Sequence, residues 1–113
     1  MQSHPMNSKF PDKHILDEAM QRIRAVVEPK KVILFGSAAR GEMGANSDLD
    51  LLVVVPSGLH RRQTAQNIYR NLIGLGFAAD IVVVTEDDVL RYKDHQGMVI
   101  KPALEEGKVL YAA

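Results

Sequence analysis

The sequence predicts a small α/β domain, and three features of the chain support that prediction. Apolar runs of strand length occupy residues 32–35, 51–55 and 81–84. Between them lie segments whose apolar residues recur at spacings of three and four, as in amphipathic helices. A strand, a helix and a second strand in this order favour a parallel crossover. We therefore expect the third apolar run to lie beside the second.

The first helix is expected to follow Asp12, whose side chain can cap its first turn. Its apolar stripe consists of Ile15, Leu16, Ala19, Met20, Ile23, Val26 and Val27. Pro29 ends this pattern. Residues 1–11 are polar and lack periodicity, so we expect them to form a flexible tail ahead of a single domain over residues 12–113.

A second helix is expected over residues 60–75, after a Pro-Ser-Gly turn. Gly74 and Gly76 are expected to end this helix before the third strand begins at about Ala79. The side chains expected on its buried face are Ala65, Ile68, Tyr69, Leu72 and Ile73.

The C-terminal part of the chain predicts two more helices and a closing edge strand. Thr85 and Asp88 have the spacing of a capping box, which marks the start of a helix. Leu90, one turn further on, is expected to pack inward. A last helix is expected over residues 98–106, and an edge strand over residues 109–111.

Composition excludes several classes of protein. The 14 basic and 14 acidic residues cancel to a net charge of zero, which gives no electrostatic case for binding long nucleic acid. The absence of cysteine excludes a disulfide framework and a thiolate metal site. The sequence contains neither an apolar run of membrane-spanning length nor a signal-peptide core. We therefore expect a cytoplasmic protein.

Two acids stand at the start of the second strand. Asp48 and Asp50 are two positions apart, so on a strand their side chains point to the same face. Carboxylates held side by side repel each other unless a cation lies between them. Mg²⁺ prefers oxygen ligands that water and substrate phosphates complete. The pair is compatible with a magnesium site, and also with a solvated turn.

A glycine and a serine follow the first strand directly. Gly36 would allow a phosphate to approach the backbone, and the Ser37 hydroxyl could donate to a phosphate oxygen. Arg40 could hold phosphate or pair with an acid to brace the loop, and both roles stay open. If the ends of the first two strands meet, they form a metal-dependent site for a nucleoside triphosphate.

Asp80 is the candidate for a third metal ligand. It stands just before four consecutive apolar residues of the third strand, where an acid is costly to bury without a partner. The parallel crossover would bring it close to Asp48 and Asp50. The alternative is an ordinary acid at a strand edge.

The pattern Gly36-Ser37, Arg40-Gly41 and Ser47-Asp48-Leu49-Asp50-Leu51 resembles the signature of the DNA polymerase beta-like nucleotidyltransferases. It is most similar to their small stand-alone branch, the minimal nucleotidyltransferases (MNT) with MntA-like antitoxins. The resemblance extends from about Ile15 to Tyr111. It implies the nucleotidyltransferase fold, a small mixed β-sheet flanked by helices. Ala38 stands where many relatives carry an arginine, so one phosphate contact of the family is missing here.

The resemblance also implies an activity. Asp48, Asp50 and Asp80 would bind two Mg²⁺ ions, and the turn with Gly36, Ser37, Arg40 and Ser47 would bind the nucleotide. The enzyme would then transfer a nucleoside monophosphate, AMP from ATP, to a hydroxyl acceptor. Small MNT proteins often pair with a helical HEPN toxin and modify one of its tyrosines, so the resemblance implies an antitoxin with a HEPN partner.

Other readings of the sequence are weaker. A P-loop requires Gly-Lys-Ser/Thr, whereas Glu42 follows Gly41 here. The chain is short for a nucleotide-sugar fold, although an Asp-x-Asp also occurs in glycosyltransferases. The main competing function is a binding module that neutralises a partner protein by docking, without catalysis.

Overall fold

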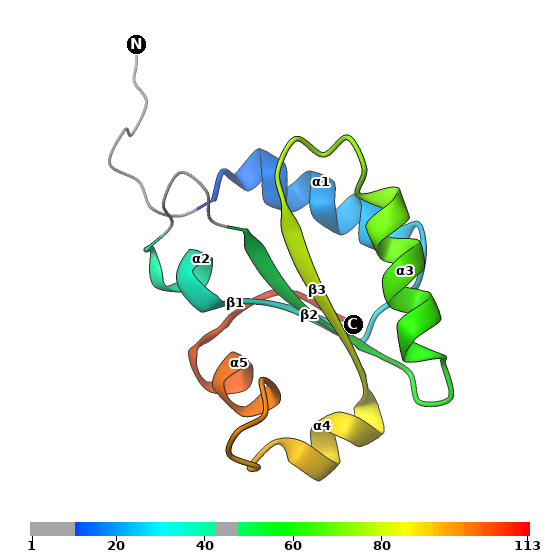
Figure 1. The fold of residues 1–113 in the computed structure, drawn as a ribbon, viewed down its shortest axis with the longest axis vertical. Helices are drawn as coiled ribbons and strands as arrows, with labels where there is room; N and C mark the ends of the chain where they lie inside the picture. Colours follow the sequence, from blue (N-terminus) through cyan, green and yellow to red (C-terminus); the bar gives the residue numbers. More distant parts are fainter. Residues whose placement is uncertain (1–10, 43–47) are drawn as a thin grey trace.

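The computed structural model describes residues 11–42 and 48–113, and in these ranges the chain forms a four-stranded sheet with helices on both faces (Figure 1). The strand order is β3-β2-β1-β4. This arrangement confirms the predicted α/β class and the small mixed sheet. In chain order the elements are α1 (Lys13–Arg24), β1 (Lys31–Phe35), α2 (Gly36–Arg40), β2 (Leu49–Val55), α3 (Arg61–Asn71), β3 (Ala79–Thr85), α4 (Glu86–Tyr92), α5 (Ile100–Glu106) and β4 (Lys108–Ala112).

The sheet is mixed because the directions of its neighbouring strands differ. β1 runs antiparallel to both β2 and β4, whereas β2 and β3 run parallel. The parallel pairing predicted for the second and third strands is therefore confirmed. The antiparallel pairing of β1 with β2 brings the end of β1 to the start of β2, as the site hypothesis required, with Phe35 opposite Asp50.

Each face of the sheet is covered by its own pair of longer helices. Side chains from α1 and α3 and from one face of the strands form the larger core, which includes Ile23, Leu51 and Ile68. The other face packs against α4 and α5, where Leu52 and Ile100 are almost fully buried. Alternation along β2 sends odd-numbered residues to the first core and even-numbered residues to the second.

The first helix is capped as predicted but ends earlier than its apolar pattern. The Asp12 side chain accepts a hydrogen bond from the backbone N–H of His14 at 2.8 Å. The helix ends at Arg24, so Val26 and Val27 lie beyond it, although both still pack partly against the larger core. The predicted tail lies almost wholly outside the described residues.

The second predicted helix is also shorter than expected. It ends at Asn71 instead of continuing to Leu75, and Ile73 is 78% exposed rather than buried. Arg22 of α1 explains this end, because its Nη1 donates to the carbonyl oxygen of Ile73 at 2.8 Å. Tyr69, also predicted to be buried, is 42% exposed because it flanks the narrow stripe that runs through Ile68.

The C-terminal elements agree with the sequence except at one residue. Thr85 and Asp88 form the predicted capping box, with both reciprocal hydrogen bonds present. Leu90 is 69% exposed instead of packed inward, so α4 covers the sheet only along the side that carries Val89. β4 forms the predicted edge strand. None of the helices in the described ranges has the length and apolar character needed to cross a bilayer.

Candidate functional site

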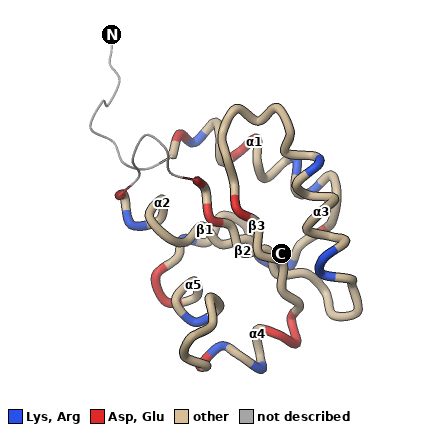
Figure 2. Tube along the Cα trace, in the orientation of Figure 1, with Lys and Arg blue, Asp and Glu red and all other residues tan. Residues whose placement is uncertain are grey.

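The strand register brings two of the predicted acids together. Asp50 of β2 pairs with Asp80 of β3 in the parallel register, and residues paired in this way have their side chains on the same face. Asp48, just before β2, is exposed and follows the same alternation. The acidic positions at the starts of β2 and β3 lie side by side (Figure 2). Asp80 therefore does not face away from Asp50 across the sheet.

The acids continue two apolar rows on the face that α4 and α5 cover. In β2 the row runs from Val54 through Leu52 to Asp50, and in β3 it runs from Val84 to Asp80. The apolar ends of both rows are packed against the helices, whereas Asp80 is exposed and Asp50 is half-buried. The polar ends of the two strands thus form an open acidic edge next to a closed core.

Gly36 lies directly against the Asp50 carboxylate. Its φ of +72° is left-handed, a conformation that side chains rarely adopt. A Cβ added to Gly36 would overlap Oδ2 of Asp50 and lie 3.2 Å from its Cγ. Glycine is therefore required here by two independent constraints. The sequence had suggested a phosphate approaching this backbone, and the structure adds the close approach of the Asp50 carboxylate.

The environment of Asp50 disfavours its charged form. Burial is the largest cause, and the charges of Asp80 and Asp48 add to it, so the pKa of Asp50 lies above its ordinary value despite the opposing charge of Arg40. Asp48 and Asp80 therefore lie close enough for their negative charges to disfavour ionisation of Asp50. A carboxyl group whose pKa is raised by burial and by neighbouring acids is typical of a functional site, and a cation would relieve the repulsion.

Arg40 takes the acid-pairing role in this structure. Its Nε donates to Oε1 of Glu42 at 2.9 Å. The pKa of Arg40 is raised mainly by this hydrogen bond and by the charge of Glu42, with smaller contributions from Glu106 and Asp50. Arg40 therefore stands within electrostatic reach of the acidic edge while its guanidinium is held by another acid. This arrangement leaves its second predicted role, toward phosphate, untested.

The turn after β1 is a short helix, α2, closed by a left-handed glycine. Ser37 is half-buried in its first turn, and its carbonyl oxygen accepts from the N–H of Glu42 at 2.9 Å. Ala38 is fully buried in the larger core. Ser47, the fourth residue predicted to bind nucleotide, lies outside the described residues.

The chemistry of the acids fits magnesium, although their arrangement does not form a complete metal cage. The donor set is all carboxylate oxygen, which hard divalent cations prefer, and both burial and the neighbouring acids raise the pKa of Asp50. Within residues 11–42 and 48–113, no three acidic, histidine or cysteine side chains stand in a metal-ligating arrangement. Water and substrate phosphates would have to supply the remaining ligands.

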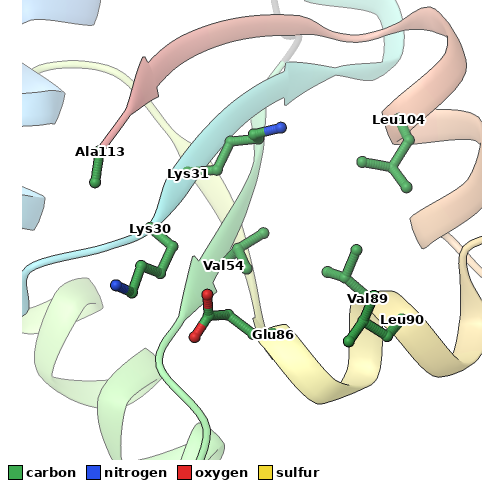
Figure 3. Close-up of a pocket in the computed structure, with 8 residues that line it drawn as sticks. All are labelled: Lys30, Lys31, Val54, Glu86, Val89, Leu90, Leu104 and Ala113. Atoms are coloured by element: carbon green, nitrogen blue, oxygen red, sulfur yellow. The ribbon is translucent and has the colours of Figure 1, made fainter.

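A largely apolar hollow lies at the other end of β2. It has a volume of about 520 Å³, and none of the predicted site residues lines it. Figure 3 shows its lining side chains, which come from the start of β1 and the residue before it, the end of β2, the helices α4 and α5, and the C-terminal residue after β4. They are Lys30, Lys31, Val54, Glu86, Val89, Leu90, Leu104 and Ala113. The acidic edge thus lies apart from this hollow.

Sequence analysis missed two residues that contact the site region. Glu42 was noted only because it rules out a P-loop, and its proximity to Arg40 in the chain could have suggested the ion pair. Tyr69 was assigned to the core, yet its hydroxyl accepts a hydrogen bond from the N–H of Ile81, next to Asp80, at 2.8 Å. No local pattern announces this contact, because it depends on how α3 packs against β3.

Comparison with known proteins gives a family and a relative with a named activity. The model of the nucleotidyltransferase domain family matches residues 15–110. The chain is 31% identical over 106 residues to "Putative protein adenylyltransferase MJ0604" of Methanocaldococcus jannaschii. This alignment covers 94% of the chain and 100% of the relative.

Solved structures share the fold at low sequence identity. A toxin–antitoxin crystal structure with AMP-PNP has a TM-score of 0.60 and 22% identity, over 87% of this chain and 73% of that one. A "putative nucleotidyltransferase" from Sulfolobus solfataricus has a TM-score of 0.59 and 21% identity, over 88% and 82%. A mutant of the MntA–HpeT toxin–antitoxin has a TM-score of 0.61 and 19% identity, over 87% and 73%. At these identities the likeness concerns the fold.

Proposed function

This chain belongs to the nucleotidyltransferase domain family, and we propose that it transfers AMP from ATP to a hydroxyl group of a partner protein. Its substrate is a nucleoside triphosphate, as the family requires. Asp48, Asp50 and Asp80 are the catalytic acids and metal ligands in this proposal. Gly36, Ser37, Arg40 and Ser47 are its nucleotide-binding residues.

One observation carries the proposal. Asp50 and Asp80 come from separate strands but are paired in register on one face, directly beyond Gly36. Acids that face each other in this way are destabilising by themselves, and the charge of Asp80 adds to burial in raising the pKa of Asp50. A functional role would explain why the protein has this pair of acids although the pair lowers its stability.

Magnesium held by these oxygens would neutralise the charge of the triphosphate and lower the pKa of the acceptor hydroxyl. Asp48 and Asp50 are the residues that would hold it on the nucleotide side, and Asp80 is the residue shared with the acceptor side. The donor set fits such an ion, as described above. The metal ligands remain a proposal.

The residues of the chain account for the remaining steps. Ser37 donates to a phosphate oxygen, and Gly36 leaves the backbone open to the triphosphate. The acceptor oxygen attacks the α-phosphorus, the bond from that phosphorus to the bridging oxygen breaks, and pyrophosphate leaves. The proton of the acceptor hydroxyl passes to the exposed carboxylate of Asp80. Positioning and charge neutralisation, rather than a covalent intermediate, provide most of the rate.

We further propose that the acceptor is a tyrosine of a HEPN-type toxin, for which this protein is the antitoxin. The structural likeness to toxin–antitoxin complexes, one of them with AMP-PNP, supports this proposal. The name of the Methanocaldococcus jannaschii relative supports a protein as acceptor. In this proposal the partner provides the acceptor hydroxyl.

The test is the transfer reaction itself. The protein is mixed with ATP, Mg²⁺ and the product of an adjacent HEPN-type reading frame, and the intact mass of the partner is followed. We expect an increase equal to AMP on a tyrosine. Asp50→Asn should reduce the rate by about 100-fold or more. The matched control is Asp17→Asn, which removes an exposed acid of α1 and should retain the wild-type rate.

The same variants separate catalysis from docking. Because Asp50→Asn removes like-charge repulsion, its melting temperature without metal should equal or exceed that of the wild type, so lost activity cannot be ascribed to unfolding. Mg²⁺ with AMP-PNP should raise the melting temperature of the wild type but not of Asp50→Asn. An unmodified partner that is inhibited equally by the wild type and Asp50→Asn would instead identify a docking antitoxin.

A further inference from the structure

Tyr69 occupies a position that burial does not explain. Its side chain is 42% exposed and lies on α3, beside the stripe that enters the larger core. Its hydroxyl accepts a hydrogen bond of 2.8 Å from the backbone N–H of Ile81 in β3. The contact is partly buried and joins residues 12 positions apart. The hydroxyl, rather than the apolar ring, therefore makes the specific contact of this residue.

The bonded amide belongs to a strand that needs support on its outer side. β3 is at one edge of the sheet, so its only strand neighbour within the described sheet is β2. Alternate amides of an edge strand point outward and have no partner in the ladder. The N–H of Ile81 is one of these, and Tyr69 occupies its outer side. The strand is thus held by β2 on one side and by α3 on the other at this residue.

The hydrogen bond from Ile81 to Tyr69 lies one residue from Asp80, the proposed metal ligand. The peptide group that carries the Ile81 N–H joins Ile81 to Asp80. Ile81 points into the larger core with 7% exposure, whereas Asp80 points to the opposite face. A peptide plane fixed on its outer side, with its next side chain buried, fixes the direction of the Asp80 Cα–Cβ bond. Tyr69 can therefore influence Asp80 without touching it.

The chain before Asp80 is joined to β2 on its inner side, where the N–H of Leu49 donates to the carbonyl oxygen of Ala78 at 2.9 Å. Asp80 is the second residue of β3, and edge strands fray first at their ends. The loop that precedes the strand contains Gly74 and Gly76, both with left-handed φ. Such glycines have wide conformational freedom. The contact from Tyr69 adds a restraint on the outer side of the strand, near this end.

We infer that Tyr69 is a positioning residue whose hydroxyl fixes the start of β3 and so holds Asp80 in register opposite Asp50. The inference rests on the proposed function, because it concerns the acid that completes the proposed metal site. Tyr69 is not itself a catalytic residue, since its contact is to the backbone of Ile81.

The test compares Tyr69→Phe with Tyr111→Phe. Tyr111 is the matched control because its hydroxyl also makes a hydrogen bond, to Glu28 at 2.5 Å, but from β4 at the opposite edge of the sheet. Amide hydrogen exchange is measured by NMR without metal. Loss of one such bond should speed exchange of the Ile81 amide by about fivefold in Tyr69→Phe. Exchange at Ile81 should not change in Tyr111→Phe.

The second readout is metal binding without turnover. Mn²⁺ alone is titrated into each protein, and free Mn²⁺ is followed by its paramagnetic resonance signal. Tyr69→Phe should weaken Mn²⁺ binding by about fivefold, whereas Tyr111→Phe should bind as the wild type does. Thermal unfolding of both variants checks that they are folded at the temperature of the titration.

The outcomes separate this inference from the proposed function. Unchanged exchange at Ile81, or faster exchange with unchanged Mn²⁺ affinity, overturns the positioning role and leaves the proposed function intact. Equal weakening in both variants overturns it as well, because the effect would then be general. A wild-type protein that binds no Mn²⁺ contradicts the metal site of the proposed function, and the inference fails with it.

Discussion

Gly36 and Asp50 show at the scale of single residues how the site constrains the sequence. The left-handed φ of Gly36 and the Asp50 carboxylate beside its Cα each exclude a side chain. The first constraint concerns the stability of the backbone, and the second concerns the place of a proposed ligand. The two constraints can be separated experimentally, because other left-handed glycines of the chain have open space around them.

Gly36→Ala should impair both stability and transfer. A left-handed backbone at a residue with a Cβ costs about 1–2 kcal/mol. The added methyl group would also displace the Asp50 carboxylate, and a shift of about 1 Å at a reacting centre can cost about 100-fold in rate. Urea unfolding and the transfer assay measure the two effects.

Gly97→Ala provides the control for this substitution. Gly97 has a similar φ of +86°, but a Cβ there would meet no atom within 4 Å. It should show a comparable loss of stability with the transfer rate unchanged. If both alanine variants lost activity equally, strain of the backbone rather than displacement of Asp50 would explain the loss at Gly36.

Among the single residues of the site, some positions could be predicted from the sequence and others could not. Asp48 and Asp50 could be placed on one face from their spacing alone. The pairing of Asp50 with Asp80 was expected from the parallel crossover and is present. The contact between Gly36 and Asp50 could not be derived in the same way. It depends on the register between the antiparallel strands β1 and β2, and the spacing of the acids alone does not determine that register.

At the scale of elements, the capping box of α4 links the end of β3 to the start of α3. The N–H of Thr85 donates to Oδ2 of Asp88 at 2.9 Å, and Arg61 of α3 donates to the same oxygen at 3.0 Å. Burial raises the pKa of Asp88, but the hydrogen bonds from Thr85 and the charge and hydrogen bond of Arg61 outweigh it, so the pKa is lowered. The folded protein therefore favours the charged form of Asp88.

Asp88→Ala should destabilise the fold by about 1 kcal/mol at neutral pH. Since the folded pKa is depressed, the contribution of Asp88 is fully present above the ordinary Asp pKa of about 4 and is lost as the pH falls through the lower folded value. Urea unfolding at several pH values should show the gap between wild type and variant closing in acid.

Asp87→Ala is the control, because Asp87 is an exposed acid in the same helical turn but is not part of the capping box. It should change the unfolding free energy little at any pH. A wild-type advantage over Asp88→Ala that persisted unchanged at pH 2 would contradict the role given to the charge of Asp88.

Element prediction failed where tertiary contacts decided the outcome. The apolar pattern predicted that α3 continues to Leu75, but the helix ends at Asn71. At this end Arg22 of α1 donates hydrogen bonds to the carbonyl oxygens of Asn71 and Ile73. Tyr69 has the spacing of a core residue, yet its hydroxyl is directed to the edge strand. Periodicity identifies a helix and its general face, whereas contacts with a neighbouring element settle its end and the residues at the border of the face.

At the scale of the whole molecule, the sheet separates a closed end from an open one. On the face beneath α4 and α5, the rows of β2 and β3 begin with acids, which are red in Figure 2. The rows end with valines packed against these helices. The packed apolar ends of these rows stabilise the fold, and this stability lets their other ends carry repelling acids. The acidic residues could be predicted as a site from their spacing in the sequence. The apolar hollow of Figure 3 could not, because its lining residues are far apart in the chain.

The most direct test of the account is a crystal structure of the protein with Mn²⁺ and AMP-PNP, with the metal located by its anomalous scattering. We predict a manganese peak in contact with carboxylate oxygens of Asp50 and Asp80, and a triphosphate beside Gly36 and Ser37. A nucleotide bound elsewhere, with no manganese peak at these acids, would contradict the account.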